Sequence, residues 1–186
     1  MLLAGTGHAL YARPAEKLQV VKLTYGPNRI GLPGLNVLCW AILSRRENFN
    51  AHGFDIFSLQ MKDAGKGPNP TDWMAVTFFN DKEEQLVLTV GGGADCLLHD
   101  FRLLKSQSGK TLQLVLADRE FNISYVDKDT VVFSFYELKK NTEGLVGRPL
   151  FYFQRVRTQT AREKYCDVGE AFKVELGIGN YMVRPQ

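Results

Sequence analysis

One short stretch of the chain concentrates the residue types that can do chemistry. After the glycines 91–93 the sequence reads Ala-Asp-Cys-Leu-Leu-His-Asp, which places Asp95, Cys96, His99 and Asp100 close together. Carboxylates, imidazole and thiolate are the side chains that bind metal ions and carry protons in proteins. This stretch is therefore the first candidate for a functional site.

A metal site is the sharpest chemistry that these residues could support. Asp95, His99 and Asp100 would need a further ligand from elsewhere, such as His52 or Glu120. In an extended strand Asp95 and His99 lie on one face, but apolar residues of the same segment share that face. A histidine satisfied by one hydrogen bond is the more common outcome. We expect no metal and no cofactor, and a metal-dependent enzyme remains the alternative.

The glycines 91–93 are better explained by a turn than by a phosphate site. Phosphate-binding glycine loops lead into a helix, whose N-terminus holds the anion. Here the glycines stand between two apolar runs, Gln85 to Val90 and Ala94 to Leu104, which both have strand composition. The pattern predicts a central hairpin.

Sequence signatures of common hydrolases are missing from the chain. There is no Gly-x-Ser-x-Gly, no His-Glu-x-x-His and no His-x-His-x-Asp, and no serine is followed three residues later by lysine. A serine β-lactamase is excluded on its own motif. Cys166 could act as a nucleophile with His52 or His99, but a cysteine in this setting is more often structural. We expect a protein that is not an enzyme and has no catalytic residue.

The three cysteines leave the redox state open. Cys39 lies in an apolar run and is expected to be buried. Cys96 and Cys166 could form a disulfide or remain free thiols in a cytosolic protein. Residues 1–12 resemble the end of a secretory signal peptide, although the charged and most of the apolar parts of a signal are missing. This start favours an exported protein, and with it the disulfide.

Composition limits the class of protein and the kinds of partner. The chain has 186 residues, 45% hydrophobic and 23% charged, which suits a single globular domain over residues 13–186. The net charge of +3 is spread along the chain, so we expect no nucleic acid as a partner. No segment approaches the length of a membrane span.

Short extended runs separated by glycine and proline turns recur along the chain. Phe57, Leu59 and Met61 alternate with polar residues, and the leucines at 112, 114 and 116 do the same. About ten such runs, with little helix, predict an all-β antiparallel sandwich, with a closed β-barrel as the alternative. Thr158 to Cys166 is the best helical candidate, whereas Ala171 to Leu176 has the composition of a strand.

Three blocks of the sequence point to a family. Asn48 to Phe54, Gly91 to Asp100 and Tyr165 to Phe172, in a chain of this size with an export-like start, resemble the CarG-type carbapenem intrinsic-resistance proteins. The resemblance implies a periplasmic protein that protects a carbapenem producer from its own antibiotic without hydrolysing it. Its partner would be a β-lactam ligand or a cell-wall enzyme.

The residues that we select as candidates for ligand binding are polar and aromatic: His52, Trp73, His99 and Asp100. A third interpretation is an interaction or scaffold domain without an antibiotic role, in which exposed strand edges assemble the chain into a homo-oligomer.

Overall fold

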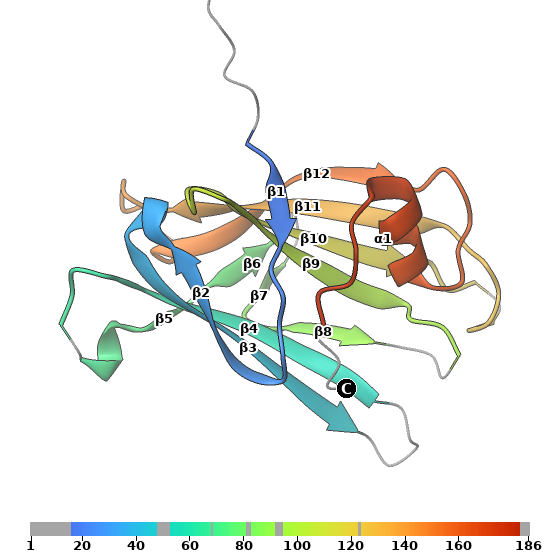
Figure 1. The fold of residues 1–186 in the computed structure, drawn as a ribbon, viewed down its shortest axis with the longest axis horizontal. Coiled ribbons are helices and arrows are strands. Elements are labelled where there is room, and N and C mark those ends of the chain that lie inside the picture. The colour runs from blue at the N-terminus through green and yellow to red at the C-terminus, as the bar shows by residue number, and fades with distance from the viewer. Residues whose placement is uncertain are drawn as a thin grey trace, which may run out of the picture.

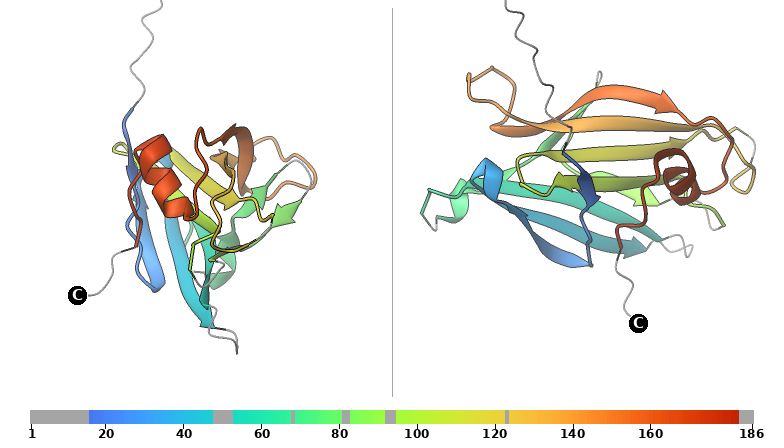
Figure 2. Two further views of the ribbon diagram at one scale, coloured as in Figure 1. Left: turned by 90° about the vertical axis from the view of Figure 1, so that its right-hand side faces the viewer. Right: turned by 45° about the horizontal axis from the view of Figure 1, so that its top comes forward.

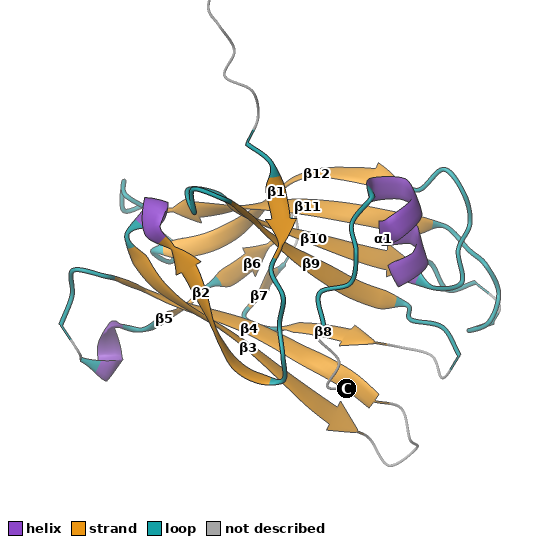
Figure 3. Ribbon diagram, in the orientation of Figure 1, coloured by secondary structure: helices purple, strands orange, loops and turns teal. Residues whose placement is uncertain are grey.

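The computed structural model describes residues 16–47, 53–67, 69–80, 83–91, 95–122 and 124–182. The predicted signal-peptide remnant at 1–12 and the candidate residue His52 lie outside these ranges. Strands dominate the described part of the chain, and Figure 3 shows them in orange with the helical segments in purple beside them.

Twelve strands, one α-helix and two short 3-10 helices follow one another in the described part of the chain. The strands are β1 (Leu18–Val20), β2 (Gly26–Leu32), β3 (Val37–Glu47), β4 (Gly53–Asp63), β5 (Met74–Ala75), β6 (Thr77–Phe79), β7 (Glu84–Gln85), β8 (Leu88–Gly91), β9 (His99–Ser106), β10 (Leu112–Arg119), β11 (Val131–Lys140) and β12 (Phe151–Thr160). The 3-10 helices are η1 (Pro33–Leu35) and η2 (Pro70–Asp72), and α1 spans Val168–Leu176.

The strands form one large, strongly twisted sheet in the order β2-β3-β4-β8-β9-β10-β11-β12-β6-β7 (Figure 1). All neighbours are antiparallel except β12 and β6. Met74–Ala75 pairs with β4 and Thr77–Phe79 pairs with β12, so this one segment links the two halves of the sheet across the core. The pairing path has two ends, β2 and β7, so the sheet is not closed into a barrel. The prediction of an all-β sandwich is confirmed.

The main core lies between the two halves of the sheet. Its fully buried side chains include Phe57, Leu59 and Met61 of β4, which the alternating pattern had assigned to one face, together with Phe101 of β9 and Phe153 of β12. Burying aromatic and aliphatic surface of this extent is the main force that holds the two halves together.

A second, smaller core lies on the other face of β9–β11, beneath α1. Phe133 and Val115 pack there against Phe172 of the helix, and the views in Figure 2 place α1 against this face of the sheet. Because side chains alternate along a strand, the odd-numbered residues of β9 face the main core and the even-numbered ones face α1.

The helix prediction was wrong in its position. Residues Thr158 to Thr160 end β12, and the helix begins one position after Asp167, including the segment Ala171 to Leu176 that had been assigned to a strand. The Asp167 carboxylate accepts hydrogen bonds from the amides of Gly169 and Glu170, which makes it an N-cap. Gly177 ends the helix with a φ of +66°, a conformation that glycine adopts at low cost.

The sequence correctly predicted that β8 and β9 are neighbours, but the two strands pair over a shorter stretch than a central hairpin implies. β8 and β9 are antiparallel, yet Gly91 and His99 form their one register pair among the described residues. β8 pairs mainly with β4, from Phe54 opposite Gly91 to Phe57 opposite Leu88. The competition between two neighbours is a tertiary effect that local sequence does not reveal.

Candidate functional site

Two cavities meet at the start of β9, and Asp100 contributes to the lining of both. The first, about 430 Å³, lies among β3, β4, β8 and the segment that follows α1. We call it the acidic cavity, because the carboxylates of Asp55, Asp95 and Asp100 line it. The second, about 500 Å³, is the Arg155 groove, named after its cationic residue. Both volumes are within the range of small-molecule sites.

The first wall of the acidic cavity is an ion-pair cluster on β3 and β4. The Tyr25 hydroxyl donates to Asp55 Oδ1 at 3.1 Å, and Arg45 Nη1 lies 3.6 Å from the same oxygen. Burial raises the pKa of Asp55 above its ordinary value, against the opposing effects of Tyr25 and Arg45. Gly53 leaves room for the guanidinium, because a Cβ at that position would lie 1.9 Å from Arg45 Nη2.

The opposite wall is built around Asp100 and Arg102, a buried ion pair on the face of β9 that looks toward α1. The Phe101 amide donates to Asp100 Oδ1 at 2.8 Å, and Arg102 Nε donates to the Gly179 carbonyl at 2.8 Å. The guanidinium of Arg102 also stacks on Phe172, 4.2 Å from the ring centroid. Burial raises the pKa of Asp100, while the charge of Arg102 acts in the opposite direction.

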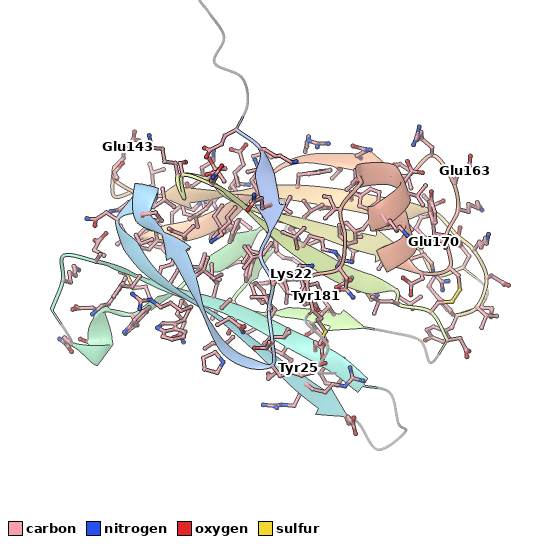
Figure 4. All side chains as sticks on the ribbon, viewed as in Figure 1. Lys22, Tyr25, Glu143, Glu163, Glu170 and Tyr181 are labelled. Carbon is pink, nitrogen blue, oxygen red and sulfur yellow. A yellow bond between two sulfur atoms is a disulfide. The ribbon has the colours of Figure 1, made fainter. Side chains whose placement is uncertain are left out.

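Tyr181 closes the cavity from the C-terminal segment. Its ring packs 4.5 Å from the ring of Phe101, and only 3% of the residue is exposed. Its pKa is raised above the ordinary value of a phenol, first by burial and then by the negative charges of Asp100 and Asp55. Figure 4 labels Tyr181 and Tyr25, which contribute the two phenol groups of this region.

A disulfide fixes the rim of the acidic cavity. Cys96 and Cys166 are bonded, with their Cα atoms 5.6 Å apart, so the predicted pairing is confirmed. Next to the disulfide, the Leu97 amide donates to Asp167 Oδ2 at 3.2 Å and the Val168 amide donates to the Leu97 carbonyl at 3.0 Å. These bonds attach the start of β9 to the first turn of α1.

The Arg155 groove borders the main core, because Leu88 and Val90 of that core line it. Strand register brings together Tyr136 of β11 and Arg155 of β12, which are direct partners, and places Ser134 opposite Leu116 of β10. The groove has an apolar floor that includes Leu116, and its polar groups include the Arg155 guanidinium, three hydroxyls and two carboxylates, those of Thr89, Ser134, Tyr136, Asp100 and Asp118. A guanidinium is the side chain best matched to a planar carboxylate, so Arg155 is the group of this lining that would hold the anionic end of a small ligand.

His99 lines the Arg155 groove rather than a metal site. Its Nδ1 lies 2.9 Å from Asp118 Oδ1 on β10, and its side chain is 47% exposed. Asp100 is the next residue, so its side chain leaves the strand on the opposite face. In the described ranges of the chain, no group of three or more histidine, cysteine, aspartate or glutamate residues is placed to hold a metal ion.

Trp73 belongs to neither cavity. It lies beside Trp40, Ile42 and Gln60 in a shallow depression on the outer face of β3 and β4, and Lys62 Nζ is 5.6 Å from its ring centroid. Four candidate residues were named from the sequence. Of these, His99 and Asp100 are adjacent at the start of β9 with side chains on opposite faces, Trp73 lies apart, and His52 falls outside the described residues.

Sequence reasoning missed Asp55, Tyr181 and Arg155, which supply the main chemistry of the two cavities. They are far apart along the chain, and each sits in a run with no recognisable motif. The one available signal was an ionisable residue inside an apolar strand pattern, as for Asp55 before Phe57 and Leu59. Such residues are buried at a cost and are often functional.

No protein-family model matches this chain, and no curated protein matches its sequence. None of the described helices is long and apolar enough to cross a membrane. Among solved structures, the crystal structure of CarG matches with a TM-score of 0.67 and 20% sequence identity, covering 89% of this chain and 99% of that chain. The similarity extends over nearly the whole of both chains, and the protein described here has a CarG-like fold.

Proposed function

We propose that this protein is a non-catalytic carbapenem-protection protein of the periplasm, which binds the antibiotic in the Arg155 groove. The observation that carries the proposal is the CarG-like fold, found over 89% of the chain. The sequence resemblance of three blocks to the carbapenem intrinsic-resistance proteins points in the same direction. Fold alone does not define function, so the groove must supply the chemistry.

The groove offers groups that complement a carbapenem. The antibiotic carries a carboxylate, which the Arg155 guanidinium can bind through two parallel hydrogen bonds. The hydroxyls of Ser134 and Tyr136 can donate to its carbonyl oxygens, and Leu116 provides apolar contact for the ring system. The volume of about 500 Å³ accommodates a molecule of this size.

The geometry of the groove supports binding without hydrolysis. Ser134 is on β11 and His99 is on β9, with β10 between them. Two strand spacings amount to roughly 10 Å, which is too far for the imidazole to take a proton from the serine hydroxyl. His99 is therefore not positioned to activate Ser134 as a nucleophile toward a β-lactam ring.

The disulfide supports the proposed export to the periplasm. Disulfides persist in oxidising compartments and are rare in the cytosol of ordinary bacteria, where thioredoxin and glutathione keep thiols reduced. Cys96 and Cys166 connect β9 to α1 across a separation of 70 residues, which is the typical use of a structural disulfide.

Titration calorimetry with a carbapenem, run beside an assay for loss of the β-lactam ring, tests the proposal. We expect saturable binding without hydrolysis, weakened about tenfold or more in Arg155→Gln, because a charge-assisted carboxylate contact is lost. Arg157→Gln is the matched control. Arg157 stacks on Phe135, 3.3 Å from the ring centroid, and Phe135 packs toward the second core.

Each outcome of this experiment has a definite meaning. Turnover of the carbapenem would refute the non-catalytic role. Absence of binding would refute the antibiotic site and would redirect the search to a cell-wall enzyme as the protected partner. Equal weakening in Arg155→Gln and Arg157→Gln would show that overall charge, and not the groove, determines the affinity.

A further inference from the structure

We propose that the acidic cavity is a separate binding site for a small primary ammonium ligand. The inference goes beyond the proposed function, because it concerns a different cavity and a ligand of opposite charge. It depends on the geometry of three residues that are more than nine-tenths buried: Asp55, Asp100 and Tyr181, which are 7%, 5% and 3% exposed. They come from β4, β9 and the segment after α1.

The Tyr181 hydroxyl is the first observation that points to a ligand. It forms no hydrogen bond with any residue that the structure describes, and in an otherwise almost completely buried residue the hydroxyl itself stays open to the cavity. A hydroxyl that faces a cavity takes its hydrogen-bond partner from water or from a ligand. A ligand in the cavity can supply the missing partner.

The carboxylates of Asp55 and Asp100 provide the second observation. Tyr25 donates to Oδ1 of Asp55, and Arg45 Nη1 lies 3.6 Å from the same oxygen. Asp100 is held by Arg102 and by the Phe101 amide, and an ionised carboxylate can accept about four hydrogen bonds in all. Both groups therefore retain capacity to accept hydrogen bonds from a ligand.

The charge of the lining selects a cation. Three carboxylates line the cavity among the described residues, and Arg45 and Arg102 are paired with two of them, Asp55 and Asp100, which leaves the charge of Asp95 without an ion-pair partner in the lining. A carboxylate in a site of low polarity favours an ammonium group with N–H donors, whereas a second anion would be repelled. Tyr181 and Phe54 add aromatic surface on which a cation can lie.

An ammonium with N–H bonds fits better than a quaternary ammonium. Three donors on one nitrogen can be shared among the carboxylates of Asp55 and Asp100 and the Tyr181 hydroxyl. A quaternary ammonium has no hydrogen to donate, and a neutral diol has no charge. The site is thus specific for the combination of positive charge and N–H donors.

Ethanolamine is a suitable probe, since it is small and carries both an ammonium and a hydroxyl group. Titration of the labelled protein, followed through the amide resonances of Leu97, Asp100 and Asn180, should show saturable shifts. Choline and ethylene glycol, at the same concentrations, should produce none. Asp55→Asn and Tyr181→Phe should each weaken ethanolamine binding roughly tenfold.

Tyr181→Phe also separates a binding role from a structural one. The hydroxyl forms no hydrogen bond to the described residues, so its removal should leave the denaturant midpoint unchanged. Tyr165→Phe is the matched control, because the Tyr165 hydroxyl donates to Glu175 Oε1 at 2.8 Å beneath α1. That variant should lose stability but bind ethanolamine normally.

Three results would overturn the inference. They are the absence of ethanolamine shifts, equal binding of choline or ethylene glycol, and unchanged binding in both Asp55→Asn and Tyr181→Phe. Arg155→Gln distinguishes the two sites, because it should weaken the carbapenem and leave ethanolamine binding intact. A negative result at one site therefore leaves the proposal for the other site standing.

Discussion

Replacing both disulfide cysteines, in Cys96→Ser/Cys166→Ser, should lower the free energy of unfolding by about 4 kcal/mol. The bond joins residues 70 positions apart, and closing a loop of that length in the unfolded chain costs this much conformational entropy in the loop-closure model. The hydrogen bonds between Leu97 and the Asp167–Val168 pair remain in the variant. The native structure should therefore persist, and the loss should come mainly through the unfolded state.

Urea titration of the folded protein measures this loss. The reference is the unaltered protein treated with a reductant, which breaks the same bond without any substitution and should lose the same free energy. The double variant should not respond to the reductant. Thiol titration of unfolded, unreduced protein should find one free thiol, that of Cys39. A loss of less than about 1 kcal/mol, or three free thiols, would refute the reasoning.

Two further predictions concern buried charges. Arg102→Met should cost about 3–5 kcal/mol of stability, because it leaves Asp100 buried without its ion-pair partner, and adding Asp100→Asn should recover part of that loss. Equal stability of the two variants would contradict this. Hydrogen bonds from Arg162 and Tyr165 lower the pKa of Glu175 to about 2 from an ordinary 4.5. A depressed carboxyl pKa stabilises the fold fully above pH 4.5, and this contribution disappears as the pH falls toward 2. Thermal unfolding across that window should depend less steeply on pH in Glu175→Gln, and an unchanged slope would argue against the assignment.

The strand pattern of the chain was predictable because its cause is local. Phe57, Leu59 and Met61 alternate with polar residues, and all three are buried on one face. The helix was missed although its signals were present, with Asp167 as N-cap and Gly177 in the left-handed conformation just past its end. The β-branched and aromatic residues of Ala171 to Leu176 suggested a strand. The capping residues at both ends nevertheless favour the helix more than this composition favours a strand.

The pairing of strands was less predictable. Gly91 to Gly93 correctly indicated that β8 and β9 are neighbours, but β8 forms most of its ladder with β4. Which of two available edges a short strand adopts depends on packing across the whole core, where contacts are far apart in the sequence. The sequence of β8 therefore does not indicate which neighbouring strand it will pair with.

The candidate site was predictable only in part, and for a similar reason. His99 and Asp100 stood out because ionisable residues interrupt an apolar run, but adjacent positions on a strand face opposite sides, so the two serve different surroundings. Asp55 and Tyr181 approach Asp100 through the curvature of the sheet and the return of the C-terminal segment. Their association is a property of the tertiary structure.

Binding of a carbapenem in the Arg155 groove without hydrolysis is the central proposal. The most direct measurement is calorimetric titration of a carbapenem into the intact protein and into Arg155→Gln and Arg157→Gln, with the antibiotic assayed for ring opening afterwards. We predict saturable binding, intact antibiotic, and a loss of affinity of about tenfold or more in Arg155→Gln alone. Hydrolysed antibiotic, or equal affinity in all three proteins, would contradict the proposal.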